Sequence, residues 1–304
     1  MTVIELIEAG ARRLADAGVA FGHGTANAFD ESAWLVLWKL GFPLDQIDDH
    51  ADAAVDAPQQ AAVEALIAER IASRKPAAYL TKEAWLQGVA FYVDERAIVP
   101  RSFIAEIIGN GDIDYWLGED TRSVLDLCTG NGSLAVLAAL CWPDVSVAAT
   151  DIWPMALEVA RINVDRHGLA DRIALIHSDG LDNVHGSYDL ILCNPPYVNA
   201  QSMAELPAEY QAEPALALAG GVDGMDFIRR LLAGAPAHMS EHAVLVLEIG
   251  NERPHFEVAF PRLPAVWLET SAGDDQVVLL TREALLTCHP GLAPGSMDAG
   301  SGPA

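Results

Sequence analysis

The sequence predicts an α/β fold in which a seven-stranded, mostly parallel sheet carries helices on both faces and follows a small N-terminal helical domain. Seven short apolar runs lie between residues 123 and 281, and helical stretches separate the first five. Apolar runs that alternate with helices in this way are typical of parallel strands covered on both faces. The first 80 residues instead carry apolar side chains at helical spacing, which predicts a separate bundle.

The N-terminal bundle is expected to contain three helices. The first covers residues 2–17. The second begins near Asp30 and ends at Gly41 and Pro43, because acidic side chains favour the start of a helix, and glycine and proline favour its end. The third runs from about residue 58 to residue 73. The apolar positions predicted to form the core of this bundle are Val3, Leu6, Ile7, Leu14, Trp34, Leu35, Leu37, Trp38, Leu40, Val63, Leu66, Ile67 and Ile71.

The remaining segments complete the predicted domains. Residues 84–99 combine a glycine with aromatic and β-branched residues, which indicates a hairpin or an extended linker. The seven later runs are SVLDL, VSVAAT, RIALIH, YDLILC, AVLVLEI, AVWLET and QVVLLT. Because only SAGDD separates the last two, they should form a hairpin that places one antiparallel strand in the sheet. The predicted domains are therefore residues 1–80 (helical), 81–104 (hairpin and linker), 105–285 (sheet) and 286–304, a Gly/Pro/Ser-rich tail expected to be disordered.

Composition excludes several classes of function. The 304 residues include 18 Lys and Arg against 43 Asp and Glu, which gives a net charge of −25 and a pI near 4.5. This charge disfavours direct nucleic-acid binding, which needs basic surface, and is compatible with a basic protein partner. No apolar run approaches the length of a membrane span, and the N-terminus lacks the pattern of a signal peptide. The four cysteines form no C-x-x-C pair or zinc-like cluster, so we expect free thiols, no metal site and a cytoplasmic protein.

A glycine-rich turn is the first chemical signal. The apolar run that contains Asp126 leads into Cys128-Thr129-Gly130-Asn131-Gly132, and a helix follows. Glycines let a ligand approach the backbone amides closely. Asp151 ends the next run, 21 residues after Gly130, where an acid suits the hydroxyl groups of a ribose. The pattern predicts a site for a nucleoside cofactor at the carboxyl ends of the strands.

The second signal is Asn194-Pro195-Pro196-Tyr197, which directly follows the run YDLILC. Two prolines fix the backbone and remove two amide donors. The side-chain oxygen of Asn194 and the carbonyl of Pro195 then form a rigid pair of acceptors. Such a pair can bind both hydrogens of a planar –NH2 group, while Tyr197 packs on its plane.

Two cofactors fit the turn at this stage. Gly130, Gly132 and Ala135 formally satisfy the dinucleotide fingerprint G-x-G-x-x-G/A, which is a weak match. Asp126 and the Asn-Pro-Pro-Tyr segment favour S-adenosylmethionine instead, because the methionine ammonium is a cation that a carboxylate can receive.

The motifs together resemble those of class I S-adenosylmethionine-dependent methyltransferases, which have a Rossmann-like fold. The Asn-Pro-Pro-Tyr element narrows the resemblance to enzymes that methylate planar amino or amide nitrogens. Further segments are similar to the protein-glutamine methyltransferases, and the resemblance spans about residues 20–283. These segments are residues 21–25 (FGHGT), 76–81 (PAAYLT), 91–96 (FYVDER), 99–102 (VPRS), 213–214 (EP), 220–224 (GGVDG) and 247–250 (LEIG).

The resemblance implies both a cofactor site and a substrate site. The cofactor would contact Asp126, Cys128, Thr129, Gly130, Asn131, Gly132, Asp151, Ile152, Asp179 and Asn194. In the family the turn lines the methionine part, Asp151 holds the ribose and Asp179 lies near the adenine. The catalytic residues that bind the glutamine amide would be Asn194, Pro195, Pro196 and Tyr197. Residues 105–285 would form the catalytic domain, and residues 1–80 would recognise a protein substrate.

Within the family, the chain is most similar to the branch that methylates the large-subunit ribosomal protein L-three, a basic protein. The sister branch modifies peptide-chain release factors at a Gly-Gly-Gln loop. Its usual Pro-Arg-Pro, followed by Thr-Glu, is replaced here by Pro100-Arg101-Ser102-Phe103. The L-three branch usually has proline where Phe103 stands, and Gly273-Asp274-Asp275 also departs from its Gly-Gly-Asp-Gly.

Three other functions remain open from the sequence. A release-factor methyltransferase would use the same site with a different protein partner. A DNA adenine methyltransferase shares the Pro-Pro element, but it must flip a base and hold phosphates, which a net charge of −25 and three lysines disfavour. The third is a non-catalytic or nicotinamide-binding protein, which binding assays with each cofactor would distinguish.

Overall fold

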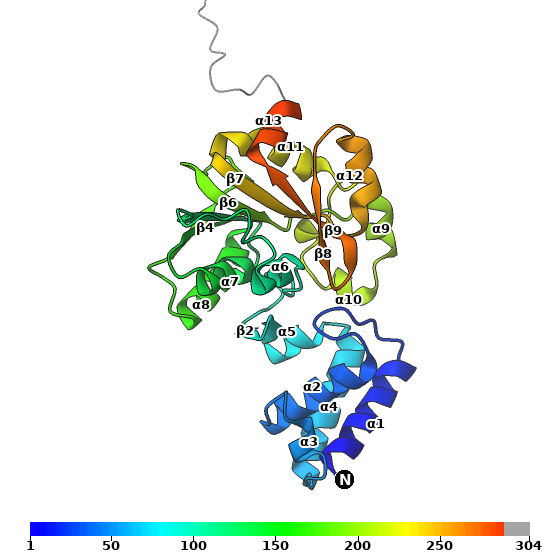
Figure 1. Cartoon of the computed structure of the whole chain (residues 1–304). Helices are drawn as coiled ribbons and strands as arrows, with labels where there is room; N and C mark the ends of the chain where they lie inside the picture. The colour runs from blue at the N-terminus through cyan, green and yellow to red at the C-terminus, as the bar shows by residue number, and fades with distance from the viewer. Residues whose placement is uncertain (289–304) are drawn as a thin grey trace, which may run out of the picture. The chain divides into compact units, whose positions relative to one another are not determined.

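The computed structural model describes residues 1–288, and the chain divides into two compact units. Unit 1 comprises residues 1–101 together with 204–217. Unit 2 comprises the other described residues, 102–203 and 218–288. Each unit has its own secondary structure and its own core (Figure 1). The helices of residues 1–288 are all too short or too polar to cross a membrane.

Unit 1 is a helical bundle. Its first helix, α1, begins with a capping box. The Thr2 side chain accepts from the Glu5 amide, and the Glu5 carboxylate accepts from the Thr2 amide. Asp56 caps α4 in the same way, and α2 ends at Gly41 with a left-handed backbone. These local signals place the three predicted helices as expected. The elements of unit 1 are α1 (Val3–Asp16), α2 (Ala28–Leu40), α3 (Ile47–His50), α4 (Ala57–Ser73), α5 (Ala77–Thr81), β1 (Ala84–Leu86), β2 (Val89–Phe91), α10 (Ala208–Gln211) and η1 (Ala215–Ala217).

A buried arginine lies within this bundle. Arg70 is fully buried, and its Nε donates to Glu31 Oε1 at 2.8 Å. A second nitrogen donates to Glu209 at 3.4 Å, and a third to the Ala20 carbonyl at 3.0 Å. The bundle therefore includes residues 204–217, which return to it from a distant part of the chain. No local pattern in the sequence predicts this return, because helical periodicity reports only neighbours along one helix.

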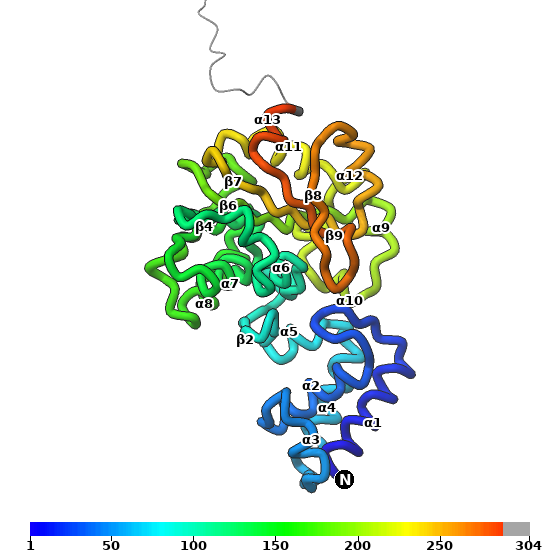
Figure 2. The backbone as a smooth tube through the Cα atoms, in the orientation of Figure 1, coloured from blue at the N-terminus to red at the C-terminus, as the bar shows by residue number. Residues whose placement is uncertain are grey.

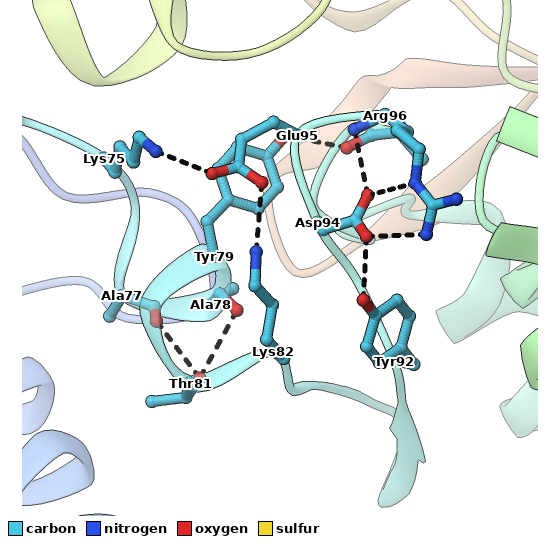
Figure 3. A network of polar contacts seen from close by, with 11 residues as sticks. Lys75, Ala77, Ala78, Tyr79, Thr81, Lys82, Tyr92, Asp94, Glu95 and Arg96 are labelled. Carbon is cyan, nitrogen blue, oxygen red and sulfur yellow. Dashed lines mark hydrogen bonds and ion pairs between the residues drawn. The ribbon is translucent and has the colours of Figure 1, made fainter. Parts of the chain in front are cut away.

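The hairpin of β1 and β2 leads into a polar network that joins residues 92–96 to the lysines on either side of α5 (Figure 3). The Glu95 carboxylate accepts from Lys75 Nζ at 2.8 Å and from Lys82 Nζ at 3.0 Å. Asp94 accepts from the Arg96 guanidinium and from the Tyr92 hydroxyl. The prediction of a hairpin in this stretch is confirmed over residues 84–91.

Unit 2 contains a seven-stranded sheet with the order β5-β4-β3-β6-β7-β9-β8. Figure 2 labels β4, β6, β7, β9 and β8 of this sheet along the backbone. Strand β9 is antiparallel to both neighbours, and the other pairs are parallel. The predicted sheet with one antiparallel strand and a final hairpin is confirmed. The strands are β3 (Ser123–Leu127), β4 (Ser146–Asp151), β5 (Ile173–His177), β6 (Tyr188–Cys193), β7 (Met239–Glu248), β8 (Val266–Thr270) and β9 (Gly273–Thr281).

Both faces of the sheet are covered by helices, as predicted. On one face, alternate residues such as Leu125, Ile191 and Leu245 form a core with α11, α12 and α13. The intervening residues, such as Val124 and Leu190, are also buried, and α6, α7 and α8 pack together on their side (Figure 1). The helices are α6 (Ile104–Asn110), α7 (Ser133–Cys141), α8 (Pro154–Arg166), α9 (Ala200–Glu205), α11 (Asp226–Gly234), η2 (Ala235–His238), η3 (Gly250–Glu252), α12 (Arg253–Ala259) and α13 (Arg282–Cys288).

Two expectations about connecting segments were wrong. Residues 178–187, between β5 and β6, contain no helix. They turn at Gly180, whose φ is +55°, and the Ser178 hydroxyl accepts from the Asn183 amide across the turn. The predicted tail also begins too early, because residues 286–288 continue α13, in which Leu285 is fully buried. The rest of the predicted tail, residues 289–304, lies outside the described residues.

Candidate active site

The glycine-rich turn lies at the carboxyl end of β3 and is organised by Asp126. This side chain is fully buried. Its Oδ2 accepts from the Thr129 hydroxyl and, at 3.1 Å, from the Ala135 amide in the first turn of α7. The other oxygen, Oδ1, has no hydrogen-bond partner in the described structure. Asp126 thus ties the turn to α7 and keeps one acceptor free.

Two glycines of the turn have different structural roles. Gly132 has φ of +81°, and a Cβ there would lie 3.1 Å from the Ala160 side chain of α8. This glycine is required for close packing of the two helices. Gly130 has φ of +55°, and a Cβ there would meet nothing within 4 Å. The backbone at Gly130 therefore faces open space, where a ligand can approach its peptide groups.

The second acid, Asp151, is the last residue of β4, which pairs directly with β3. Asp151 Oδ2 accepts from the Gly130 amide at 2.9 Å, and Oδ1 accepts from the Trp153 amide at 2.8 Å. Asp151 therefore lies beside the glycine-rich turn, and its predicted role in holding a ribose stays a prediction. Ile152 is 41% exposed beside it.

Burial raises the pKa of Asp126 to about 7, because desolvation of the carboxylate outweighs its hydrogen bonds to Thr129 and Ala135. Between the unfolded value near 4 and this folded value, the folded protein binds a proton that the unfolded chain releases. The contribution of Asp126 to the free energy of unfolding therefore decreases as the pH rises from about 4 to about 7.

Replacing Asp126 by asparagine should remove this pH dependence. The free energy of unfolding of Asp126→Asn, relative to the wild type, is expected to rise by about 3 kcal/mol between pH 5 and pH 8. Urea denaturation at several pH values measures this difference. Glu119→Gln, which removes one exposed negative charge from the same unit, is the control. A difference that stays constant with pH for Asp126→Asn would show that the folded protein does not protonate this carboxyl group.

Asp179 follows β5 at the same edge of the sheet. Its carboxylate makes a bidentate ion pair with Arg230 of α11, at 3.0 and 3.2 Å. The Arg230 guanidinium also lies over the Phe227 ring. Arg230 is not among the predicted site residues, because its separation of 51 residues from Asp179 leaves no local pattern in the sequence. The expected position of Asp179 near an adenine ring remains a prediction.

The Asn-Pro-Pro-Tyr segment begins where β6 ends, and β6 pairs with β3 on the side opposite β4. Cys193 is in register with Leu127, so Asn194 and the glycine-rich turn leave neighbouring strands at the same level. The structure therefore brings together the two segments that the sequence analysis singled out. Asn194 is partly exposed, and Pro195 is buried. Among the described residues, no cluster of His, Cys, Asp and Glu side chains is arranged to hold a metal ion.

Tyr197 is held closely by neighbouring backbone. A Cβ at Gly250, whose φ is +53°, would lie 2.5 Å from a ring carbon of Tyr197. A Cβ at Gly224 would lie 2.2 Å from the Tyr197 carbonyl oxygen, and one at Gly220 would lie 2.7 Å from its Cα. Gly220, Gly224 and Gly250 thus make room for this one residue.

Known proteins that resemble this chain are methyltransferases. Residues 116–215 match the family described as methyltransferase small domain. The ribosomal protein uL3 glutamine methyltransferase of Bordetella pertussis is 51% identical over 289 residues, which cover 94% of this chain and 97% of that protein. Those of Burkholderia pseudomallei and Neisseria meningitidis serogroup B are 51% and 47% identical, covering 92% and 94% of this chain and 94% of each relative.

The chain belongs to the ribosomal protein uL3 glutamine methyltransferase family. This membership confirms the predicted resemblance to the glutamine methyltransferases, and with it the class I methyltransferase fold. The hMettl16 catalytic domain, solved in complex with MAT2A 3'UTR hairpin 6, has a similar fold, with a TM-score of 0.50 and 15% identity over 74% of this chain and 81% of that one.

Glu248 of this chain is a further candidate site residue that was not predicted from the sequence. Glu248 ends β7 and is 2% exposed. Its Oε1 accepts from the Tyr197 hydroxyl at 3.2 Å. A signal was present in the sequence, since Glu248 is the single charged residue of the apolar run AVLVLEI. A charged side chain at the end of a buried strand is costly unless it is bound by donors.

Proposed function

We propose that this chain transfers a methyl group from S-adenosylmethionine to the side-chain amide nitrogen of a glutamine in ribosomal protein uL3. The observation that carries this proposal is the Asn194–Tyr197 segment, which leaves the sheet beside the glycine-rich turn. The identity of about 50% to uL3 glutamine methyltransferases over nearly the whole chain supports the same substrate.

The residues of the turn are suited to this cofactor. Asp126 Oδ1 is an unpartnered buried acceptor, which an ammonium group would satisfy, and Gly130 faces open space. We assign the methionine part to Asp126, Thr129, Gly130 and Gly132, with Cys128 and Asn131 in the same turn. Asp151 and Ile152 would bind the ribose side, and Asp179 the adenine. The bound cofactor supplies an electrophilic methyl group, so the protein's task is to place a nucleophile.

Replacing Asp151 by alanine should weaken cofactor binding. Loss of a charge-assisted hydrogen bond costs about 1.5–3 kcal/mol, so affinity should fall roughly 10- to 100-fold. Titration calorimetry with S-adenosylmethionine measures the change. Asp151→Asn keeps an acceptor oxygen and should retain more of the affinity. Unchanged binding by Asp151→Ala would contradict the assignment of the ribose to this residue.

An amide nitrogen is a weak nucleophile because its lone pair is delocalised, and its orientation therefore matters. The Asn194 side-chain oxygen and the Pro195 carbonyl can accept both hydrogens of the glutamine amide. Tyr197 can pack against the amide plane. Two fixed acceptors hold the nitrogen in one position and stabilise the positive charge that develops on it during transfer. The active site thus acts mainly by orientation.

The acidic composition supports a basic protein as substrate, because opposite charges accelerate encounter. We assign substrate recognition to the helical N-terminal part, since the sheet unit holds the proposed cofactor and amide sites. The net charge of −25 favours a ribosomal protein over DNA, whose phosphates need basic surface. The place of action would be the cytoplasm.

The test uses purified protein, S-adenosylmethionine, unmodified uL3 and an unmodified release factor. Peptide mass spectrometry should find one added methyl group on a glutamine of uL3. Methylation of the release factor alone would retain the chemistry and reject the proposed substrate. Methylation of neither protein would reject the proposed function.

A further inference from the structure

Glu248 connects three segments of unit 2. Its Oε2 accepts from the Ser102 hydroxyl at 2.5 Å and from the Phe103 amide at 2.9 Å, at the start of α6. Its Oε1 accepts from the Tyr197 hydroxyl at 3.2 Å. These partners lie 146, 145 and 51 residues away along the chain. One carboxylate therefore binds the end of β7, the start of α6 and the Asn-Pro-Pro-Tyr segment to one another.

Three hydrogen-bond partners surround the Glu248 carboxyl group. A buried carboxylate is costly without donors, and three donors converge here on its two oxygens. Burial still raises the pKa of Glu248, while the bonds to Ser102, Phe103 and Tyr197 oppose that increase. A carboxyl group held by three partners fixes the position of each of them, including the Tyr197 hydroxyl.

The bond between the Tyr197 hydroxyl and Glu248 matters because the backbone and the ring of Tyr197 are also tightly packed. Close packing against Gly250 restricts the ring on one side, and the backbone of Tyr197 is confined by Gly220 and Gly224. The hydroxyl bond to Glu248 restricts the ring further at its other end. Because Tyr197 lies three residues after Asn194, a shift of its ring would also move the segment that carries the two amide acceptors.

We propose that Glu248 is a positioning residue for methyl transfer, which acts by holding the Tyr197 hydroxyl and thereby the Asn194–Tyr197 segment in its reactive arrangement. This inference rests on the proposed function of that segment. Glu248 does not itself touch the substrate amide. Its removal should lower kcat and leave the KM for S-adenosylmethionine nearly unchanged, since the turn after β3 has its own anchor in Asp126.

The experiment compares Glu248→Gln, Tyr197→Phe and the double variant in the methylation assay. Each single change should reduce kcat on the order of 10-fold, which is less than the 100-fold that a displacement of about 1 Å can cost. The double variant should be no slower than the slower single variant, because both changes remove the same contact. An unchanged kcat for Glu248→Gln, or independent effects that multiply, would overturn the proposal.

A matched carboxylate at the opposite edge of the sheet is the control. Asp189 accepts from the amides of Arg122 and Ser123 and from the Ser240 hydroxyl, at the amino ends of the strands. Asp189→Asn should lower the stability with kcat unchanged. This comparison separates a positioning effect from a general loss of stability.

A second measurement keeps the proposal testable if the wild type methylates neither protein. Hydrogen exchange at the amides of Asn194 and of residues 197–199 should become faster in Glu248→Gln and should not change in Asp189→Asn. Wild-type methylation tests the proposed function, and exchange tests the positioning role. Equal exchange in Glu248→Gln and the wild type would overturn the role of Glu248 whatever the substrate.

Discussion

Replacing Asn194 by alanine should lower the turnover of glutamine methylation on the order of 100-fold or more, as for other preorganised polar contacts to a reacting group. Asn194 directly follows the buried Cys193, whose position is fixed by the register between β6 and β3. Pro195 and Pro196 then restrict the backbone. Alanine would preserve this path and remove one of the two acceptors for the glutamine amide.

Steady-state methylation of uL3, with product measured by mass spectrometry, gives kcat and KM for this variant. Asn110→Ala, an exposed substitution at the end of α6, should leave kcat unchanged. Calorimetry with S-adenosylmethionine would confirm that the variant still binds cofactor. Near wild-type turnover in Asn194→Ala would contradict the assigned role of the side-chain oxygen.

Replacing Arg70 by alanine should destabilise unit 1 by about 3–5 kcal/mol, the usual cost of breaking a buried ion pair by removing one partner. Arg70 is fully buried, and Glu31 and Glu209 are 1% and 2% exposed. Without the guanidinium, Glu31 would remain buried with its charge uncompensated, and Glu209 would keep its ion pair with Arg74 at 3.3 Å. Burial already raises the pKa of Glu31, and Arg70 is the main group that opposes this increase.

Urea denaturation followed by circular dichroism measures the loss of stability. Arg12→Ala removes an exposed arginine whose ion pair with Glu8 spans one turn of α1 at 3.8 Å. It should change the stability by less than about 0.5 kcal/mol, as is usual for exposed pairs. Equal, small effects of the two substitutions would show that Arg70 does not hold the bundle together.

The elements of both units were largely predictable from the sequence, because their causes are local. Helix starts at Thr2 and Asp56 depend on side chains that bond to amides three residues later. The helix end at Gly41 depends on a left-handed backbone that glycine adopts readily. Buried parallel strands need near-continuous apolar runs, and such runs are visible without any knowledge of their neighbours.

The proposed site was predictable to the same extent. Each of its two motifs is a short segment after a strand, and carboxyl ends of parallel strands meet at one edge of a sheet. The turn after β3 and the Asn194–Tyr197 segment could therefore be placed near each other before the structure was known. The partners that hold these motifs in position could not be predicted, because they come from other segments.

The sequence by itself thus determined the fold class, the seven strands, the two motifs and the family. Tertiary structure alone decided which distant residues meet: Glu248 with Ser102 and Tyr197, Asp179 with Arg230, and Arg70 with Glu209. It also decided that β9 lies between β7 and β8. The physical reason is that periodicity, caps and turns act within a few residues, whereas these contacts require that segments 50 to 150 residues apart pack together first.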